Sequence, residues 1–395
     1  MTASVHIHSG SWPRPRLATL QTARNVSRGW RLGDFTGASF EVSRDDDAFG
    51  IVAERDLLSL GNMVVIEETG LPPWVGFIEK DTWGLKATGV AVQCKEAAQL
   101  LQERKTPKQF LVAENTSSAV RRVLLEANAQ NPTGIFAATV ESGCRATVDL
   151  SSVSVADALD SLCEISGQEW WVEPAISAGK VELTLHVGSR GEDKSGSIVL
   201  REGQLVDAKY VLDAKNIVAS LTIVGSGASF ATRPAATVSV GGKAERAAQS
   251  SESVSVAGQM ITATTEQSAR LLPWLGPATA RDLVSVSPQL SDDATIAGLA
   301  VSRLDRGYRG PEEVEAIVAL GSLAGVVVGD TIGLEAESLG PSGISKSFRV
   351  QEMAVDETTV TVRGHTEGGL TPQRGLRGLL RGIEASVRDL QRGSS

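Results

Sequence analysis

The sequence predicts a mainly β protein with an α+β part, in which two related β-barrels bracket a small α+β domain. An insertion in the second barrel and a C-terminal helix complete the expected architecture. Three observations lead to this fold class. A short β motif occurs near both ends of the chain, and Gly, Val, Thr and Ser recur in the alternating runs typical of short strands and tight turns. In the middle of the chain the hydrophobic period lengthens to about 3.6 residues.

The repeated motif is a Gly-Asn or Gly-Asp turn that opens a strand. The first copy is Gly61-Asn62 before an apolar run, and the second is Gly329-Asp330 before a similar run. Each copy is followed by two more strand-like runs, at 74–80 and 89–94 in the first and at 347–352 and 358–364 in the second. Duplication within one chain can double the symmetry of its oligomer. We therefore expect the two turns to occupy equivalent places around one ring.

The first barrel is expected over residues 1–94. Its strands are predicted where apolar and polar residues alternate, at 38–43, 63–67, 74–79 and 90–94. Short strands at this spacing, separated by Gly and Pro turns, are typical of a barrel or a sandwich.

The α+β domain is expected over residues 95–200. A short helix at 95–103 ends before the Thr106-Pro107 step, because the residue before Pro is pushed out of the helical region. A second helix begins at Thr116 with a Thr/Ser cap, and a third, over 155–165, has Ser154 as its cap and Gly167 at its end. The runs 169–173 and 181–186 predict a hairpin after the third helix.

The second barrel is expected to be interrupted. We assign residues 201–228 and 310–369 to it, with opening strands at 208–212 and 217–224. Between them, residues 229–309 are polar and rich in Ala, Ser and Thr, which predicts a lateral insertion with a helix at 293–304.

The last segment, 370–395, predicts a helical arm. Its apolar residues follow heptad-like steps, at Leu376, Leu379, Leu380, Ile383, Val387 and Leu390. Its other side is rich in Arg. We favour contact with neighbouring subunits or with a docked protein; a basic amphipathic helix on a membrane or nucleic acid remains the alternative.

Composition restricts the function classes. The formal charge of -9 argues against a general nucleic-acid binder, although an acidic passage would let DNA slide without sticking. Three scattered Cys predict neither a zinc site nor a disulfide framework. No secretory signal is visible and no run is long enough for a membrane helix, so we expect folding in the cytoplasm and no membrane insertion.

Two carboxylates are candidates for chemistry. Glu169 and Glu173 flank Trp170-Trp171, and paired carboxylates beside aromatic residues are a feature of glycoside hydrolases. Alternation along an ordinary half-exposed strand produces the same pattern, and we favour that interpretation.

Histidines and a run of acids complete the candidates. His6 and His8 are close in sequence but lack a third partner, and His186 and His365 are isolated, so we expect an exposed N-terminal strand rather than an active site. The run 45–47 is three adjacent Asp without the spacing of a calcium loop, which favours a solvated turn. The sequence therefore predicts no catalytic, metal or cofactor site.

Several segments together resemble one family. The run Trp74-Val75-Gly76-Phe77-Ile78 follows a Gly/Pro turn, and the helix at 155–165 continues through Gly167 into the aromatic strand at 170–171. The step from 213 to 225 and the turn at 328–332 follow in the same order. Over about residues 16–366 this order is similar to that of the tail hub family, which includes the baseplate hubs of contractile phages and injection systems and the N-terminal hub module of tail-associated proteins in long non-contractile tails.

The resemblance implies a non-enzymatic virion protein of the tail tip. Members of that family form trimers whose six barrels match the hexameric tail tube above and a threefold spike or fibre below. The implied partners are further copies of the chain, the distal tail or tube ring, the tape-measure protein and tip, spike or fibre proteins, and DNA passes without specific binding. A cell-wall hydrolase and a glycan- or receptor-binding protein remain the alternatives, although only 4% of residues are aromatic.

Overall fold

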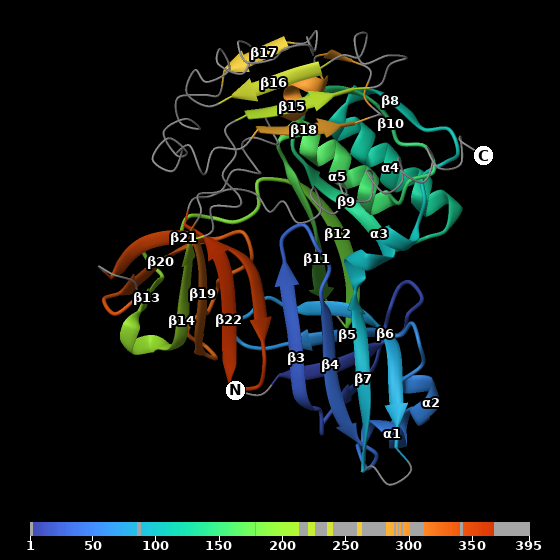
Figure 1. Ribbon diagram of the computed structural model, residues 1–395. Coiled ribbons are helices and arrows are strands. Elements are labelled where there is room, and N and C mark those ends of the chain that lie inside the picture. Colours follow the sequence, from blue (N-terminus) through green and yellow to red (C-terminus); the bar gives the residue numbers. More distant parts are fainter. Residues whose placement is uncertain are drawn as a thin grey trace, which may run out of the picture.

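The computed structural model is mainly β and places most strands in one large sheet (Figure 1). The structure describes residues 3–84, 88–177, 179–212, 220–225, 235–239, 259–262, 282–287, 290, 292–293, 295–300, 312–339 and 343–366. The expected arm at 370–395, with its six apolar residues from Leu376 to Leu390, lies outside these residues.

Barrel one occupies the N-terminal part of the large sheet. Its strands are β1 (Ser4–His8), β2 (Arg16–Leu20), β3 (Arg24–Arg31), β4 (Gly37–Ser43), β5 (Met63–Glu67), β6 (Trp74–Trp83) and β7 (Gly89–Glu96). Two short helices, α1 (Ala48–Ile51) and α2 (Glu54–Leu57), lie between β4 and β5. The neighbours run in the order β3-β4-β7-β6-β5-β1-β2, and every pair is antiparallel.

Barrel two repeats this pairing order. Its strands are β13 (Val199–Arg201), β14 (Leu205–Leu212), β19 (Glu312–Ala319), β20 (Thr331–Ala336), β21 (Ile344–Val355) and β22 (Thr359–His365), with the 3-10 turn η2 (Glu202–Gln204) before β14. They are ordered β14-β19-β22-β21-β20-β13. The difference is at the end, where β13 runs parallel to β20 while β1 runs antiparallel to β5.

The two barrels share one 13-stranded sheet, because β21 also pairs with β3. Phe40 and Trp74 of barrel one belong to the same buried apolar cluster as Phe348 and Met353 of barrel two. The sequence predicted two barrels but not this continuity. Among the described residues, strand pairing leaves this branched sheet with three terminal strands, β14, β2 and β13.

The middle domain packs helices on two small sheets. Its elements are η1 (Ala97–Gln99), α3 (Leu100–Glu103), β8 (Leu111–Asn115), α4 (Thr116–Gln130), β9 (Ile135–Val140), β10 (Arg145–Asp149), α5 (Val155–Ser166), β11 (Glu169–Ser177) and β12 (Lys180–Gly188). In α5, the Ser154 hydroxyl accepts from the Asp157 N–H at 3.0 Å, and Gly167 ends the helix at φ 73°, as predicted. The cap of α4 differs from the expected Thr116: the Asn115 side chain accepts from the Ser117 N–H, because Asn115 is the last residue with extended φ and ψ.

A separate four-stranded sheet lies beyond the middle domain, at the top of Figure 1. It contains β15 (Ser220–Val224), β16 (Ala235–Ser239), β17 (Gln259–Thr262) and β18 (Asp282–Val286). We expected residues 217–224 to open barrel two, but β15 pairs with β16 and β18 instead. The reason is apolar burial: Leu221 and Ile223 join the core of the middle domain, as does Ile296 from the helical residues 295–300.

Candidate functional site

The two strand-opening turns have the same backbone geometry. Gly61 has φ 86° and Gly329 has φ 107°, both in the region that favours glycine. The Gly61 N–H donates to the Ile78 carbonyl at 2.9 Å, and the Ile78 N–H donates to the Asn62 carbonyl at 2.9 Å. At the second turn the Gly329 N–H donates to the Val350 carbonyl and the Val350 N–H to the Asp330 carbonyl, both at 2.8 Å.

The equivalence continues along the next strand. Strand β6 carries a register shift between Ile78 and Lys80, and β21 carries one between Val350 and Glu352. A bulge adds one unpaired residue and increases the local twist. The two modules therefore share a turn, a register and a bulge, although almost none of their side chains match.

A glycine from another segment touches each turn. A side chain on Gly10 would place its Cβ 2.1 Å from the Gly61 carbonyl oxygen, and one on Gly191 would place its Cβ 2.1 Å from the Gly329 carbonyl carbon. Real Cβ atoms do not approach other atoms so closely, so both contacts need glycine. Sequence reasoning missed Gly10 and Gly191, because neither is close in sequence to the turn that it touches.

The second residue of each turn differs in charge. Asn62 is neutral: its amide donates to the carbonyls of Asp56 at 2.7 Å and Leu57 at 3.0 Å, and its oxygen accepts from the Gly10 N–H at 3.3 Å. This side chain ties the turn to α2 and to the segment after β1.

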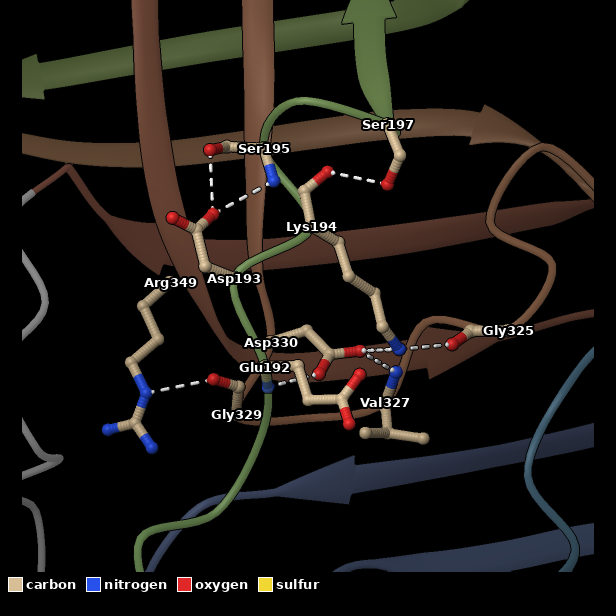
Figure 2. Close-up of polar contacts among 10 residues, drawn as sticks. All are labelled: Glu192, Asp193, Lys194, Ser195, Ser197, Gly325, Val327, Gly329, Asp330 and Arg349. Carbon is tan, nitrogen blue, oxygen red and sulfur yellow. Dashed lines mark hydrogen bonds and ion pairs between the residues drawn. The ribbon is translucent and has the colours of Figure 1, made fainter.

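Asp330 is fully buried, and both oxygens of its carboxylate accept hydrogen bonds (Figure 2). Its oxygens accept from the N–H groups of Glu192 and Val327 and from the Lys194 ammonium, each at 2.8 Å. Lys194 also donates to the Gly325 carbonyl at 2.8 Å. A buried carboxylate needs such partners, so the 192–194 segment is held against the turn.

Arg349 links the barrel-two turn to the middle domain. Its guanidinium meets the Glu169 carboxylate with two contacts, at 2.7 and 3.2 Å, and both side chains are nearly buried. The same side chain donates to the Gly329 carbonyl at 2.9 Å and to the Arg190 carbonyl at 2.8 Å. A two-pronged Arg–carboxylate contact fixes geometry as well as charge.

The two carboxylates considered for glycoside chemistry have structural partners. Glu169 is paired with Arg349, and Glu173 accepts from the Trp171 indole at 2.9 Å and lies 3.4 Å from the His186 ring nitrogen. The Trp171 and His186 rings stack with centroids 5.5 Å apart. Glu169 thus has a partner on barrel two, and Glu173 has its partners within the hairpin.

The prediction of an exposed N-terminal strand is wrong, because β1 is buried. His6 is 8% exposed and His8 is fully buried, because β1 lies between β2 and β5. His6 contacts Thr19 at 2.8 Å and Glu67 at 3.0 Å, and His8 contacts the Arg14 carbonyl at 3.0 Å. Burial lowers the pKa of both imidazoles, which favours their neutral forms.

The acidic run at 45–47 does not converge on a cation. Asp46 points inward and accepts from the backbone of Gln21, Thr22 and Ala48 at 2.7–3.0 Å. Asp45 and Asp47 are exposed. Within the residues that the structure describes, no cluster of His, Cys, Asp and Glu could hold a metal ion, and no helix has the length and hydrophobicity to cross a membrane.

Comparison of sequences identifies no relative. No protein-family model matches the sequence. No curated protein matches it either.

Comparison of structures does find similar proteins. A tail protein from Neisseria meningitidis superposes with a TM-score of 0.59 at 11% identity, over 94% of this chain and 99% of that one. The 43 kDa tail protein of prophage MuSo2 from Shewanella oneidensis superposes at 0.55 and 10% identity, over 91% and 98% of the chains. Prophage tail protein gp18 from Listeria monocytogenes superposes at 0.55 and 9%, over 97% and 100%. The chain thus has the fold of these tail proteins, which confirms the fold that the resemblance implied.

Proposed function

We propose that this chain is a structural hub of the tail tip in a phage or phage-like particle. Three copies form a ring whose barrels alternate between barrel one and barrel two. The observation that carries the proposal is the duplicated module, in which the Gly61 and Gly329 turns share hydrogen bonds, register and bulge. Because backbone geometry is equal while side chains differ, two barrels of one chain can occupy similar places in a ring.

Such a ring adapts symmetry. Six barrels from three copies present a nearly sixfold surface to the hexameric tail tube or distal tail ring, while the unlike parts of each chain retain threefold symmetry for a tip, spike or fibre. In this assembly the tape-measure protein and then DNA pass through the ring. The formal charge of -9 supports passage without retention, because acidic surfaces repel phosphate.

The remaining parts have proposed places as well. The turn residues Gly61, Asn62, Gly329 and Asp330 lie at corresponding positions around the ring. The middle domain covers the barrels from one side, and the arm at 370–395 contacts a neighbouring subunit or docked protein. The protein is a virion component that folds in the host cytoplasm, has no cofactor and catalyses no reaction.

The proposal is tested by mass photometry of the purified chain together with cryo-EM of assembled tails. We expect a threefold ring with six barrels at the end of the tail tube. A chain that stays monomeric and is absent from the ring in assembled tails would contradict the proposal.

A further inference from the structure

One contact between the two barrels within one chain is a short antiparallel strand pair. Beyond its bulge, β21 faces β3 with Glu352 opposite Arg31 and Val355 opposite Arg28. An ion pair of 3.1 Å joins Arg31 to Glu352. Met353 and Val355 are buried in the cluster that both barrels share. This contact therefore joins the barrels through backbone hydrogen bonds and apolar burial.

The β21–β3 contact uses one strand edge of each barrel. Each barrel also has the strand edge that corresponds to the one used by the other barrel, and that edge is not paired within the described residues. In barrel one, β6 beyond its bulge pairs with β7, and residues 80–83 have no second strand neighbour among the described residues. In barrel two, β14 pairs with β19 alone within the same residues. Edges of this kind leave backbone N–H and C=O groups available to another strand.

The duplication fixes which residues correspond. The matching bulges make Lys80 equivalent to Glu352 and Trp83 equivalent to Val355. On the other partner, Tyr210 lies opposite Val314, as Arg28 lies opposite Ala38.

The two reference positions are themselves equivalent. Val314 faces Gly364 and Ala38 faces Cys94, and these residues pair with the equivalent Val350 and Ile78. Tyr210 therefore corresponds to Arg28, so each half of the contact has a defined counterpart.

We propose that barrel one of one copy joins barrel two of the next copy through an antiparallel pair of β6 and β14, in the register of the β21–β3 contact. Asp81, Thr82 and Trp83 then lie opposite Leu212, Val211 and Tyr210 of the next copy. The occupant of each edge is a second copy of this chain, and the contact is head to tail. This inference rests on the proposed function and specifies its interface.

The side chains suit an interface that forms after folding. Met353 and Val355 are fully apolar, whereas their counterparts Asp81 and Trp83 are joined by a 2.7 Å hydrogen bond from the indole and remain partly exposed. The Arg44 guanidinium lies over the Trp83 ring at 5.4 Å. On β14, the Tyr210 hydroxyl donates to Glu312 at 2.5 Å. Amphipathic edges of this kind keep a free copy soluble and still offer aromatic area to a partner.

Cysteine cross-linking tests the register. We would combine Thr82→Cys with Val211→Cys in a Cys144→Ser background, since Cys144 is the exposed native thiol. Directly opposed residues in such a pair lie within the distance that a disulfide spans. Upon oxidation of the assembled protein we expect most chains to be linked in a ladder that ends at three copies, and the link to be lost upon reduction.

Two controls make the outcome decisive. Arg31→Cys with Glu352→Cys occupies the same kind of position within one chain, so it should form an internal disulfide and show that the geometry supports linkage. Thr82→Cys with Lys209→Cys shifts the register by two residues and should link far less. Circular dichroism checks that each variant is folded.

The outcomes separate this inference from the hub proposal. A threefold ring in which Thr82→Cys and Val211→Cys do not link, while the internal control does, overturns the inference and leaves the hub standing. Links that continue beyond three copies support the strand pair and contradict the trimer. A chain that forms neither links nor a ring overturns both.

Discussion

The middle domain meets the two barrels through equivalent strands but with different chemistry. On barrel one, the face of β5 and β6 presents Met63, Val65, Val75 and Phe77, which belong to the apolar core of the middle domain. By register, the same positions on barrel two are Thr331, Gly333, Ser347 and Arg349. The contact there is the Glu169–Arg349 ion pair. The duplicated barrels thus have similar backbone geometry but different side chains. Apolar packing joins barrel one to the middle domain, and an ion pair joins barrel two to it.

The largest effect should come from the apolar face. Phe77 is 5% exposed, and Phe77→Ala should lower the free energy of unfolding by about 3–5 kcal/mol, because it leaves a cavity in the middle-domain core. Urea unfolding measures this loss. The matched control is Leu125→Ala on α4, where the residue is 70% exposed and the loss should be small. Equal losses for both variants would contradict the assignment of Phe77 to the shared core.

The Glu169–Arg349 contact should contribute to stability as a nearly buried ion pair. Arg349→Met leaves Glu169 nearly buried without its partner, which should lower the free energy of unfolding by about 3 kcal/mol. Removing both charges with Arg349→Met and Glu169→Leu should restore part of the loss, since Glu169 is no longer buried without its ion-pair partner. A double-mutant cycle checks this, and strictly additive losses would show that the two side chains do not interact.

Exchanging the turn residues sharpens the comparison further. Asp330→Asn places an amide where three donors converge, and we expect a loss of about 2 kcal/mol. Asn62→Asp turns a donor toward the carbonyls of Asp56 and Leu57 into an acceptor, with an expected loss of about 1 kcal/mol because Asn62 is partly exposed. Thermal unfolding of both variants provides the test. A larger loss at Asn62 would reverse the proposed ranking of the two turns.

Each barrel should also lose stability at low pH, by a similar amount in the two barrels and by less than the losses predicted above. Burial by itself would raise the pKa of Asp46 and Glu312, but hydrogen bonds outweigh it and hold each pKa below the usual value. The donors are Ala48, Thr22 and Gln21 for Asp46, and Lys346, Thr366 and Tyr210 for Glu312. Because the folded pKa is the lower one, the stabilisation is present above the unfolded pKa near 4 and is lost as the pH falls below it.

The variants Asp46→Asn and Glu312→Gln isolate these two groups. Each should reduce the stability at neutral pH by about 1 kcal/mol and flatten its decline between about pH 5 and 2. Urea unfolding across this pH range measures both effects. An unchanged acid slope would contradict the role of the carboxylate.

Local sequence signals predicted the limits of a helix and the two turns, whereas the long-range packing of the strands was not predicted. Ser154 and Gly167 mark the limits of α5 because caps depend on neighbouring residues, and the Gly61 and Gly329 turns were visible because each opens an apolar run. The position of β15 was missed, since its apolar residues do not encode which core will cover them. Burial of His6 depends on β2 and β5 lying on either side of it, which no local pattern reveals.

The candidate site was recognised only in part. The turns were predicted from sequence, whereas Glu169 was considered as a possible acid and not as the partner of Arg349. These two residues are far apart in the chain, and either would be ordinary on a strand by itself. Aligning the two modules residue by residue places Arg349 at the position of Phe77. Only this alignment reveals the change from an apolar to a charged side chain that indicates a different contact.

The most direct test of the duplicated ring is a cryo-EM map of the assembled tail tip. We expect three copies whose six barrels alternate around one ring, with the Gly61-Asn62 and Gly329-Asp330 turns at the same height and radius. A map in which the two turns lie at different heights or radii, or in which only one barrel of each chain enters the ring, would contradict the account.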